Sequence, residues 1–338
     1  MSGRCAIGLD VGGTKILGGL VDETGRVLLS RRIPTPVAEG PAGVFAAMRR
    51  LIRELLDQAG DREVVGIGLG MPGLIDRQRG ISVHSPNTGW SNVPVLPEFT
   101  EFGLPVDMEN DVRCHALGEY WFGAGRGVRH FVLLTLGTGL GSGIVVDGEL
   151  FQGGSGMPGE IGHVVVDPQG PPCGCGNRGC LEALVGGRGL ARRAREAGIA
   201  RDVQELIALA RAGEPRALGL VEEVARHLGW GISIMANLFN PQRVILGGGL
   251  AKALGDLLFG SLRRYAEAMT MPGIRGTYDI VPAALGEEAG VVGAAALFPA
   301  LTGGAATIAP GPAEPRGPLA PPGCGAPGSP AAGGEVRP

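Results

Sequence analysis

A cluster of three cysteines and one histidine is the strongest chemical pattern in the sequence. Cys173, Cys175 and Cys180 fall within eight residues, and His163 lies ten residues before the first of them. Three thiolates and one imidazole fill a tetrahedral Zn²⁺ shell, and four protein ligands leave no open position on the metal. The spacing therefore predicts a structural zinc site and disfavours the alternative of buried thiols beside an unrelated histidine.

Three glycine-rich turns follow apolar runs and could hold the groups of a nucleotide. They read DVGGTK at 10–15, GTGLGSG at 137–143 and GGG at 247–249. Glycines allow backbone N–H groups to approach an anion closely, and a carboxylate at a strand end can hold Mg²⁺ through water. The third turn suits a flat ligand such as adenine. The residues expected to bind nucleotide are Asp10, Gly12, Gly13, Thr14, Lys15, Gly137, Thr138, Gly139, Gly248 and Gly249.

Simpler explanations exist for these turns. An ordinary glycine hairpin explains 10–15 as well as phosphate binding does, and close packing of a strand on a helix explains 247–249 equally well. The turn at 137–143 invites a dinucleotide-binding interpretation, but the residues after Gly143 are strand-like where that motif requires a helix. The Walker A pattern is also absent. A second phosphate-binding hairpin therefore fits 137–143 better.

The tripeptide END at residues 109–111 joins a predicted strand to a predicted helix. Asp111 could simply cap that helix, which is a common use of aspartate. The carboxyl edge of a sheet is also where α/β enzymes place catalytic groups. The residues alone leave both interpretations open.

Strands and helices must position these groups, and the apolar periodicity predicts where they lie. Two similar units are expected, because the strand, glycine turn and strand of the N-terminus recur from residue 130, a weak internal duplication. Mixed strands and helices in two similar halves predict an α/β architecture of two lobes. Strands are expected over 5–9, 16–21, 27–33, 64–69, 104–109, 130–136, 144–146, 243–246 and 278–281. Helices are expected over 41–59, 112–122, 188–197, 203–212, 215–238, 251–269 and 287–301.

Composition excludes several classes of protein. The 338 residues carry a formal net charge of -3 and are 44% hydrophobic, which suits a packed core and argues against a nucleic-acid partner. The N-terminus lacks the pattern of a secretion signal, and no run of about 18 apolar residues occurs, so we expect a cytoplasmic protein with no membrane partner. Gly, Pro and Ala dominate from Gly303 on, which predicts a disordered tail over 303–338.

Taken together, these motifs resemble the ROK family of sugar kinases and repressors. The resemblance covers residues 5–301 and rests on DVGGTK, END, GTGLGSG and the block GEIGHVVVDPQGPPCGCGNRGCLE at 159–182. It implies an actin-like, hexokinase-like (ribonuclease H-like) ATPase fold with a cleft between two lobes. The small lobe is expected to comprise 1–112 and 287–302, and the large lobe 113–286, which includes the irregular loop 153–180 with the metal candidates (the zinc loop). The final helix would return to pack on the small lobe.

The resemblance also implies roles for individual residues. Asp111 would be the catalytic base for a sugar hydroxyl, with ATP as the phosphoryl donor and Mg²⁺ near Asp10. His163 would bind both Zn²⁺ and sugar, because one imidazole nitrogen on the metal leaves the other free to bond outward. The sugar-binding residues implied by the family pattern are Asn110, Glu160, His163 and Glu182, with Gly73 and Asn87 lining the same cleft.

Glucose is the best single prediction for the acceptor sugar. The stretch ALGEYWFGAG at 116–125 and the surroundings of Glu182 look most like those of glucokinases. Fructose, N-acetylmannosamine and N-acetylglucosamine are the alternative acceptors, and polyphosphate is an alternative donor. By family likeness we expect a homodimer or homotetramer.

Two functions other than a kinase are alternatives for this sequence. Sugar-responsive repressors of the family carry a DNA-binding helix-turn-helix, but only four residues precede the first predicted strand, so no such domain is expected. A zinc-stabilised binding protein would need neither two phosphate-binding hairpins nor a catalytic carboxylate. We therefore expect an enzyme.

Overall fold

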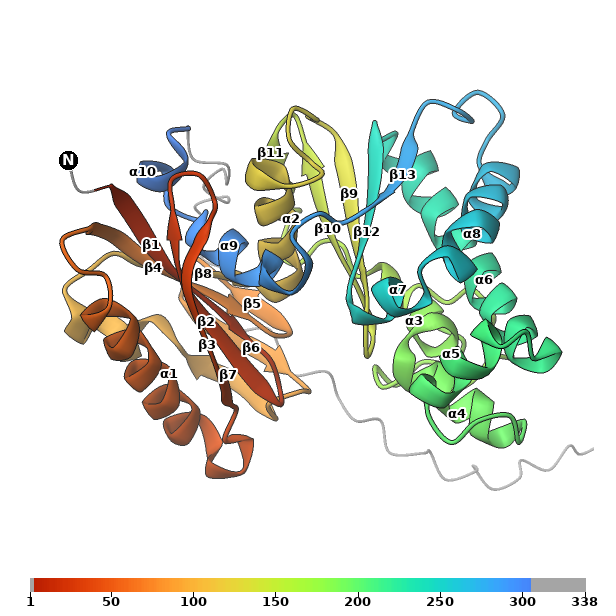
Figure 1. Ribbon diagram of the computed structural model, residues 1–338, viewed down its shortest axis with the longest axis horizontal. Coiled ribbons are helices and arrows are strands. Elements are labelled where there is room, and N and C mark those ends of the chain that lie inside the picture. Colours follow the sequence, from red (N-terminus) through yellow and green to blue (C-terminus); the bar gives the residue numbers. More distant parts are fainter. Residues whose placement is uncertain (1–2, 305–338) are drawn as a thin grey trace, which may run out of the picture.

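The computed structural model describes residues 3–304 and contains two five-stranded mixed sheets side by side (Figure 1). The strands of the first sheet are β1 (Arg4–Val11), β2 (Lys15–Asp22), β3 (Val27–Pro34), β4 (Glu63–Met71) and β8 (Val106–Asn110). Their order is β3-β2-β1-β4-β8. The first three strands in this order are antiparallel neighbours, whereas β4 is parallel to both β1 and β8.

The second sheet repeats this layout. Its strands are β9 (Phe131–Leu136), β10 (Leu140–Val146), β11 (Glu149–Leu150), β12 (Arg243–Gly247) and β13 (Asp279–Pro282). Their order is β11-β10-β9-β12-β13, with three antiparallel strands followed by two parallel ones. The matching orders confirm the predicted internal duplication. They also place the turns 10–15 and 137–143 at equivalent positions, each in the hairpin of a central strand.

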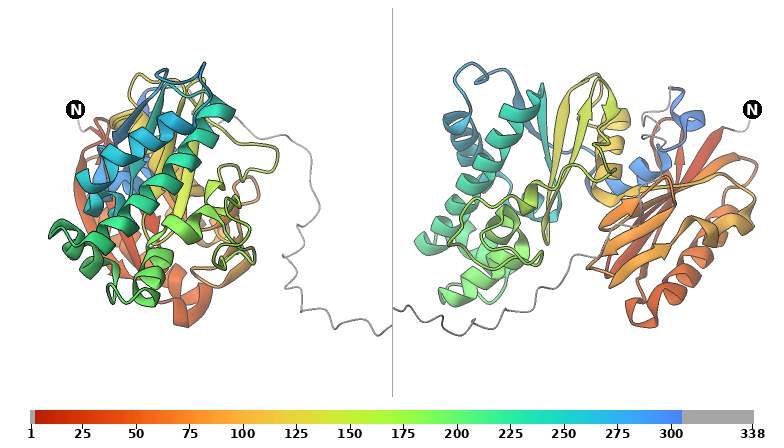
Figure 2. Two further views of the ribbon diagram at one scale, coloured as in Figure 1. Left: turned by 90° about the vertical axis from the view of Figure 1, so that its right-hand side faces the viewer. Right: turned by 180° about the vertical axis from the view of Figure 1, so that it is seen from behind.

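Each sheet has its own hydrophobic core. Helix α1 (Gly40–Asp57) packs on the first sheet, and its residues Val44, Met48 and Leu51 are fully buried with β1 and β4. The helices of the second half form the larger core and lie on the far side of the second sheet, where α6 and α8 run side by side (Figure 2). These helices are α3 (Leu181–Val185), α4 (Gly187–Glu196), α5 (Val203–Arg211), α6 (Pro215–Phe239), α7 (Gly249–Leu254) and α8 (Asp256–Met269).

Two helices lie between the sheets. They are α2 (Asp111–Phe122) and α9 (Ala289–Ala295), and a third core cluster joins them to both halves (Figure 1). The fully buried Glu119 carboxylate of α2 accepts the backbone N–H groups of Ala124, Ala284 and Leu285 at 2.6, 3.1 and 2.9 Å. This carboxylate therefore fixes residues 284–285, where the chain begins to return to the first half. The return of the last helical segment to that half, as predicted, is confirmed by its packing on β1, β2 and β4.

Glycines allow α9 to lie directly on the first sheet, and this close approach gives a stability prediction. A Cβ at Gly68 would stand 1.9 Å from the Ala294 carbonyl oxygen of α9. Gly68→Ala should therefore lower the free energy of unfolding by about 1–3 kcal/mol, because the helix must move off the sheet. Gly260→Ala, within α8 where nothing lies within 4 Å of the added atom, is the control and should be neutral or stabilising. Equal melting temperatures for the two variants would contradict this packing.

Two predicted helices are wrong in extent. The helix expected over 251–269 is divided into α7 and α8, because Gly255 between them has a φ of 51°. The helix expected over 287–301 is divided into α9 and α10 (Pro299–Thr302). Phe298 is extended there, with φ -102° and ψ 114°, because the following proline disfavours a helical conformation. The 3-10 helices within residues 3–304 are η1 (Val37–Glu39), η2 (Leu96–Phe102), η3 (Ile161–His163) and η4 (Gly286–Glu288); η2 has seven residues and the others have three each.

Several strands within residues 3–304 differ from prediction, among them the two-residue strand β11, which was not predicted. The strand expected over 144–146 begins earlier, at Leu140, so only 137–139 form the turn. A third, antiparallel sheet was not predicted and consists of β5 (Leu74–Asp76), β6 (Ile81–Ser85) and β7 (Trp90–Pro94). These strands have three to five residues each, too few for a clear alternation of apolar residues. From residue 305 on, the predicted disordered tail lies outside the described residues, and within 3–304 no helix has the length and apolar composition to cross a bilayer.

Candidate active site and metal centre

The junction of β8 and α2 holds two predicted site residues. Asn110 caps α2, because its Oδ1 accepts the N–H of Arg113 at 3.1 Å, and its Nδ2 donates to the Gly73 carbonyl at 3.0 Å. Asp111 is the first residue of the helix, and its Oδ1 accepts the N–H of Val112 at 2.9 Å. The cap is therefore Asn110 and not Asp111, and the structure brings Gly73 to the same junction.

The Asp111 carboxyl group is half-buried and lies close to a second carboxylate. Burial and the nearby Asp10 carboxylate raise the pKa of Asp111 to about 7. Asp10, at the end of β1, lies 3.7 Å from His115 Nε2. Burial alone would lower the pKa of His115, but the carboxylates of Asp10 and Asp111 raise it above its ordinary value. Two carboxylates and an imidazole thus meet where β1, β8 and α2 converge, and oxygen donors of this kind suit Mg²⁺.

The turn 10–15 is tightly bonded to its surroundings. The N–H of Gly12 donates to the Lys15 carbonyl at 2.9 Å, and Thr35 Oγ1 donates to the Gly12 carbonyl at 2.7 Å. A Cβ at Gly13 would lie 2.7 Å from the Asn87 carbonyl, so the loop carrying Asn87 packs against the turn. Lys15 Nζ lies 3.9 Å from Glu287 Oε2, an exposed contact. The structure therefore places Asn87 beside the predicted phosphate-binding turn.

The turn 137–139 packs against the start of α3, just after the zinc loop, and against the start of α4. Glu182 Oε2 accepts the N–H of Leu140 at 2.9 Å, and a Cβ at Gly139 would stand 2.2 Å from the same oxygen. The N–H of Arg188 donates to the Thr138 carbonyl at 3.1 Å, at the start of α4. One oxygen of Glu182, which was predicted to bind sugar, is thus used by the backbone of this turn.

The third glycine turn approaches the end of β9. Gly248 has a φ of 95°, and a Cβ there would lie 2.3 Å from the Leu136 carbonyl oxygen. Nothing lies within 4 Å of a Cβ built on Gly249. Close backbone packing therefore explains Gly248, whereas the space beside Gly249 is open to a ligand.

The four predicted metal ligands lie together. Cys173 Sγ is 3.6 Å from His163 Nδ1, Cys175 Sγ is 3.6 Å from Cys180 Sγ, and all four ligand atoms lie within 4.8 Å of one another. A tetrahedral Zn²⁺ with Zn–S of about 2.3 Å separates its ligand atoms by about 3.6–3.8 Å. Burial and hydrogen bonds from the other thiols raise the pKa of Cys180 to about 12, an effect that a bound cation would reverse by stabilising the thiolate. Donors and spacing suit Zn²⁺.

His163 joins this cluster to a carboxylate. Its Nδ1 faces Cys173, while its Nε2 lies 3.8 Å from Glu160 Oε2 at the start of η3. Burial raises the pKa of Glu160, the charge of His163 lowers it, and that of Glu182 raises it. A metal on Nδ1 would fix the ring and leave Nε2 facing outward, as the double role of His163 requires.

Three polar residues at this site were not predicted: His115, Arg113 and Gln152. His115 follows Asp111 by four residues, so helical spacing could have placed both on one face of α2. Arg113 Nη2 donates to Gln152 Oε1 at 2.7 Å although the two residues are 39 positions apart. No pattern in the sequence indicates that contact.

Comparison with known proteins identifies the family. A model of the ROK family matches residues 6–300. The chain belongs to the ROK family. Glucokinase from Thermotoga maritima is 41% identical to this ROK protein over 315 residues, which is 88% of this chain and 98% of that protein. Relatives at lower identity include N-acetylmannosamine kinase from Citrobacter koseri (34%, 74% of this chain and 85% of that protein) and a xylose repressor from Bacillus subtilis (30%, 85% and 75%).

Solved structures of ROK proteins share the fold. A ROK glucokinase from Streptomyces griseus, in complex with glucose and AMPPNP, has a TM-score of 0.76 at 34% identity, covering 87% of this chain and 98% of that chain. The ROK hexokinase from Thermus thermophilus has a TM-score of 0.77 at 38% identity, covering 86% and 97%. The predicted family and the predicted α/β, actin-like and hexokinase-like fold are confirmed.

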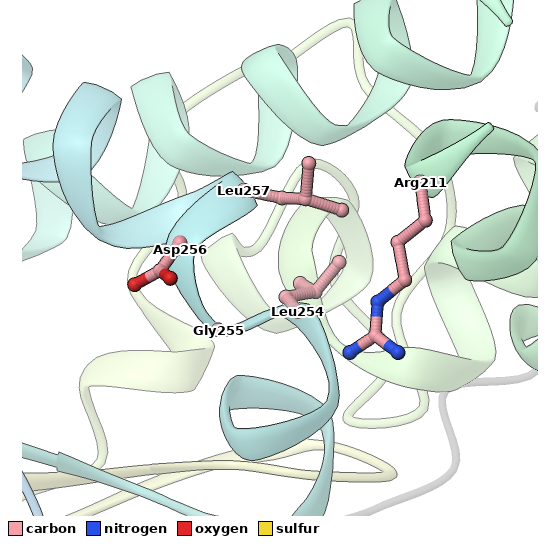
Figure 3. Close-up of a pocket in the computed structure, with 5 residues that line it drawn as sticks. All are labelled: Arg211, Leu254, Gly255, Asp256 and Leu257. Carbon is pink, nitrogen blue, oxygen red and sulfur yellow. The ribbon is translucent and has the colours of Figure 1, made fainter. Parts of the chain in front are cut away.

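An open hollow in the second half of this ROK protein is separate from these groups (Figure 3). It is lined by Arg211, Leu254, Gly255, Asp256 and Leu257, where α5 ends and α7 meets α8. Arg211 Nη2 donates to the Ala253 carbonyl at 2.8 Å. The length of α7 separates the hollow from Gly249, so it does not coincide with the third glycine turn.

Proposed function

We propose that this ROK protein is a glucokinase, which transfers the γ-phosphoryl group of ATP to glucose and forms glucose 6-phosphate. The observation that carries the proposal is the half-buried Asp111 carboxyl group at the start of α2, because partial burial and the nearby Asp10 carboxylate raise its pKa to about 7. A general base works best when its pKa lies near the working pH. The 41% identity to a glucokinase over nearly its whole length supports glucose as the acceptor.

We place the substrates between two lobes, a small one of residues 1–112 and 287–302 and a large one of 113–286. The duplicated sheets support this division, because each has its own core. The phosphates of ATP would lie on the hairpin turns 10–15 and 137–139, which occupy equivalent positions in the two sheets. The adenine would lie beside Gly249. When bound, Mg²⁺ held through water by Asp10 would neutralise phosphate charge.

The proposed reaction is an in-line displacement. The primary hydroxyl of glucose attacks the γ-phosphorus, the bond from that phosphorus to the bridging oxygen of ADP breaks, and Asp111 takes the hydroxyl proton. Because the transition state is largely loose, positioning and charge neutralisation contribute more than the base. A general base contributes about 10²–10⁴-fold.

The sugar hydroxyls would be held by groups from both sides of the site. Glu160 and His163 Nε2 lie 3.8 Å apart on the zinc-bound side, and the structural Zn²⁺ would keep them in place. Asn110 lies next to Asp111, and its side-chain amide has a second N–H besides the one that donates to the Gly73 carbonyl. The Oε1 atom of Glu182 is assigned to the sugar, since its Oε2 accepts the N–H of Leu140.

The experiment that tests this function is a coupled assay of ADP release with Mg-ATP against a panel of sugars. The panel holds glucose, fructose, mannose, N-acetylglucosamine and N-acetylmannosamine, and polyphosphate replaces ATP in a parallel series. The expected result is the highest kcat/KM with glucose. A preference for another sugar would show that glucose is not the acceptor, but it would leave Asp111 as the proposed base. If the protein is folded and zinc-loaded but has no activity on any sugar, a sugar-sensing role would be favoured. One relative of this chain is a xylose repressor.

The ionisation of Asp111 predicts how activity depends on pH. Asp111 must be deprotonated to accept a proton, so kcat/KM for glucose should rise with pH and reach a plateau above its pKa of about 7. The rise should span about one pH unit on either side of that value. The measurement is kcat/KM at saturating Mg-ATP across this range. A flat profile through pH 7 would argue against Asp111 as the base.

We also propose that the protein forms a homodimer or homotetramer. Exposed apolar residues in the second half support this proposal. Trp230 and Leu238 on α6 are 42% and 71% exposed, and Met271, just after α8, is 59% exposed. Large apolar side chains grouped on adjacent helices commonly mark protein contacts. Light scattering on the purified protein would distinguish a dimer or tetramer from a monomer.

A further inference from the structure

A buried ion pair beside the proposed base takes no part in the chemistry above. Glu109 is the next-to-last residue of β8, before Asn110, and Arg113 lies in the first turn of α2. Their side chains are 1% and 3% exposed, and Arg113 Nη2 lies 3.3 Å from Glu109 Oε2. Removing two charges from water is costly, and an apolar pair of similar volume is often as stable. The ion pair is therefore not explained by stability alone.

The other bonds of Arg113 reach a distant part of the chain. Its Nη1 donates to the Gly156 carbonyl at 2.6 Å, and its Nη2 donates to Gln152 Oε1 at 2.7 Å. Both acceptors belong to the segment 151–160, which runs from β11 to the proposed sugar ligand Glu160. Near the end of this segment Ser142 Oγ donates to the Gly159 carbonyl. The segment is thus bonded to α2 at its middle and to β10 close to Glu160.

We propose that Arg113 is a positioning residue for the sugar, which fixes the segment 151–160, and with it Glu160, against the start of α2 that carries Asp111. This inference rests on the proposed function. Asp111 and Glu160 belong to different elements, and a sugar held by one is presented correctly to the other only when their separation is fixed. The planar guanidinium suits this task, because it bonds Gly156 and Gln152 while its charge stays beside Glu109.

The test compares four variants with the wild-type protein. Arg113→Lys keeps a charge beside Glu109 but lacks the fork that reaches both acceptors. Gln152→Leu removes one acceptor and leaves the ion pair intact. The double variant Glu109→Gln/Arg113→Met removes both buried charges together, so no charge is left unpaired. Arg263→Met is the matched control, because Arg263 also donates to a backbone carbonyl, that of Ile280, at 3.0 Å.

The KM for glucose is expected to rise about 5-fold in Gln152→Leu and about 10- to 100-fold in the two Arg113 variants, while the KM for ATP changes less than about twofold. Arg263→Met should lower the melting temperature and leave the KM for glucose unchanged. Equal rises in both KM values, or an unchanged KM for glucose in Gln152→Leu and Arg113→Lys, would overturn the inference. If the double variant does not fold, these two single variants still decide it.

The same proteins separate this inference from the proposed function. If the wild type phosphorylates no sugar, the proposed function fails, and equilibrium binding of glucose is measured by calorimetry instead. Weaker glucose binding in Arg113→Lys than in the wild type and Arg263→Met would support the positioning role. Equal binding in all of them, or no glucose binding by the wild type, would overturn it.

Discussion

Replacing Asp111 by asparagine is expected to lower kcat for glucose phosphorylation by about 10²–10⁴-fold, while glucose and ATP still bind. An asparagine side chain has the same shape and can still accept the N–H of Val112, as Asp111 Oδ1 does at 2.9 Å. It cannot take the proton of the attacking hydroxyl. The coupled assay measures kcat, and calorimetry measures the affinity for each substrate.

The stability of the same variant separates a catalytic loss from unfolding. Burial and Asp10 raise the pKa of Asp111 from 3.8 to about 7, so the folded protein binds a proton there that the unfolded chain has lost. The contribution of this group to stability therefore falls as the pH rises from about 4 to 7 and stays unfavourable above that range. At pH 8, Asp111→Asn should melt at a higher temperature than the wild type.

A second aspartate supplies the matched control. Asp107 is also on β8, but it pairs with Arg77 away from the proposed base, with Arg77 Nε 3.0 Å from its Oδ1. Asp107→Asn should lower stability and keep kcat. A wild-type kcat in Asp111→Asn would contradict the assignment of the base.

Replacing Cys175 by serine is expected to remove most of the bound zinc and to raise the KM for glucose about tenfold or more. The remaining three ligands bind the ion less tightly, because a hydroxyl is a poor substitute for a thiolate. Without the ion, His163 loses its anchor at Nδ1, and Glu160, 3.8 Å from Nε2, loses its neighbour. Zinc is measured by atomic absorption and the KM by the coupled assay.

Two controls accompany this variant. Cys5→Ser changes a fully buried cysteine of β1 that is not part of the cluster, so it should cost stability and leave zinc content and KM unchanged. Treating the wild type with a chelator should reproduce the effect of Cys175→Ser, and added Zn²⁺ should reverse it. Unchanged zinc content and sugar affinity in Cys175→Ser would show that the cluster is not the metal centre.

Local sequence patterns predicted the parts of the site whose members are close along the chain. Cys173, Cys175 and Cys180 fall within eight residues, so a tight loop brings their thiols close together, and the four ligand atoms, with that of His163, lie within 4.8 Å of one another. The turns 10–15 and 137–143 were found for a similar reason, because each joins two neighbouring antiparallel strands. These hairpins also indicated the internal duplication, whereas the strand order of each sheet was not predicted.

Contacts between distant segments could not be predicted in this way. The bond from Arg113 to Gln152 and the approach of Glu182 to Gly139 depend on how α2 and the zinc loop pack on β10. The break between α7 and α8 depends on the backbone of one residue, Gly255, whose left-handed φ of 51° the apolar pattern does not record. The helix cap at Asn110 was missed because the neighbouring aspartate is an equally good capping residue.

The most direct test of the central proposal is the identification of the product formed from ATP and glucose by the wild-type protein and by Asp111→Asn. Phosphorus NMR of the reaction mixture would follow the loss of ATP and the appearance of a sugar phosphate. The predicted result is stoichiometric formation of ADP and glucose 6-phosphate by the wild type, with a rate about 10²–10⁴-fold lower in the variant. ATP left intact by a folded, zinc-loaded wild-type protein, or equal rates in the two proteins, would contradict it.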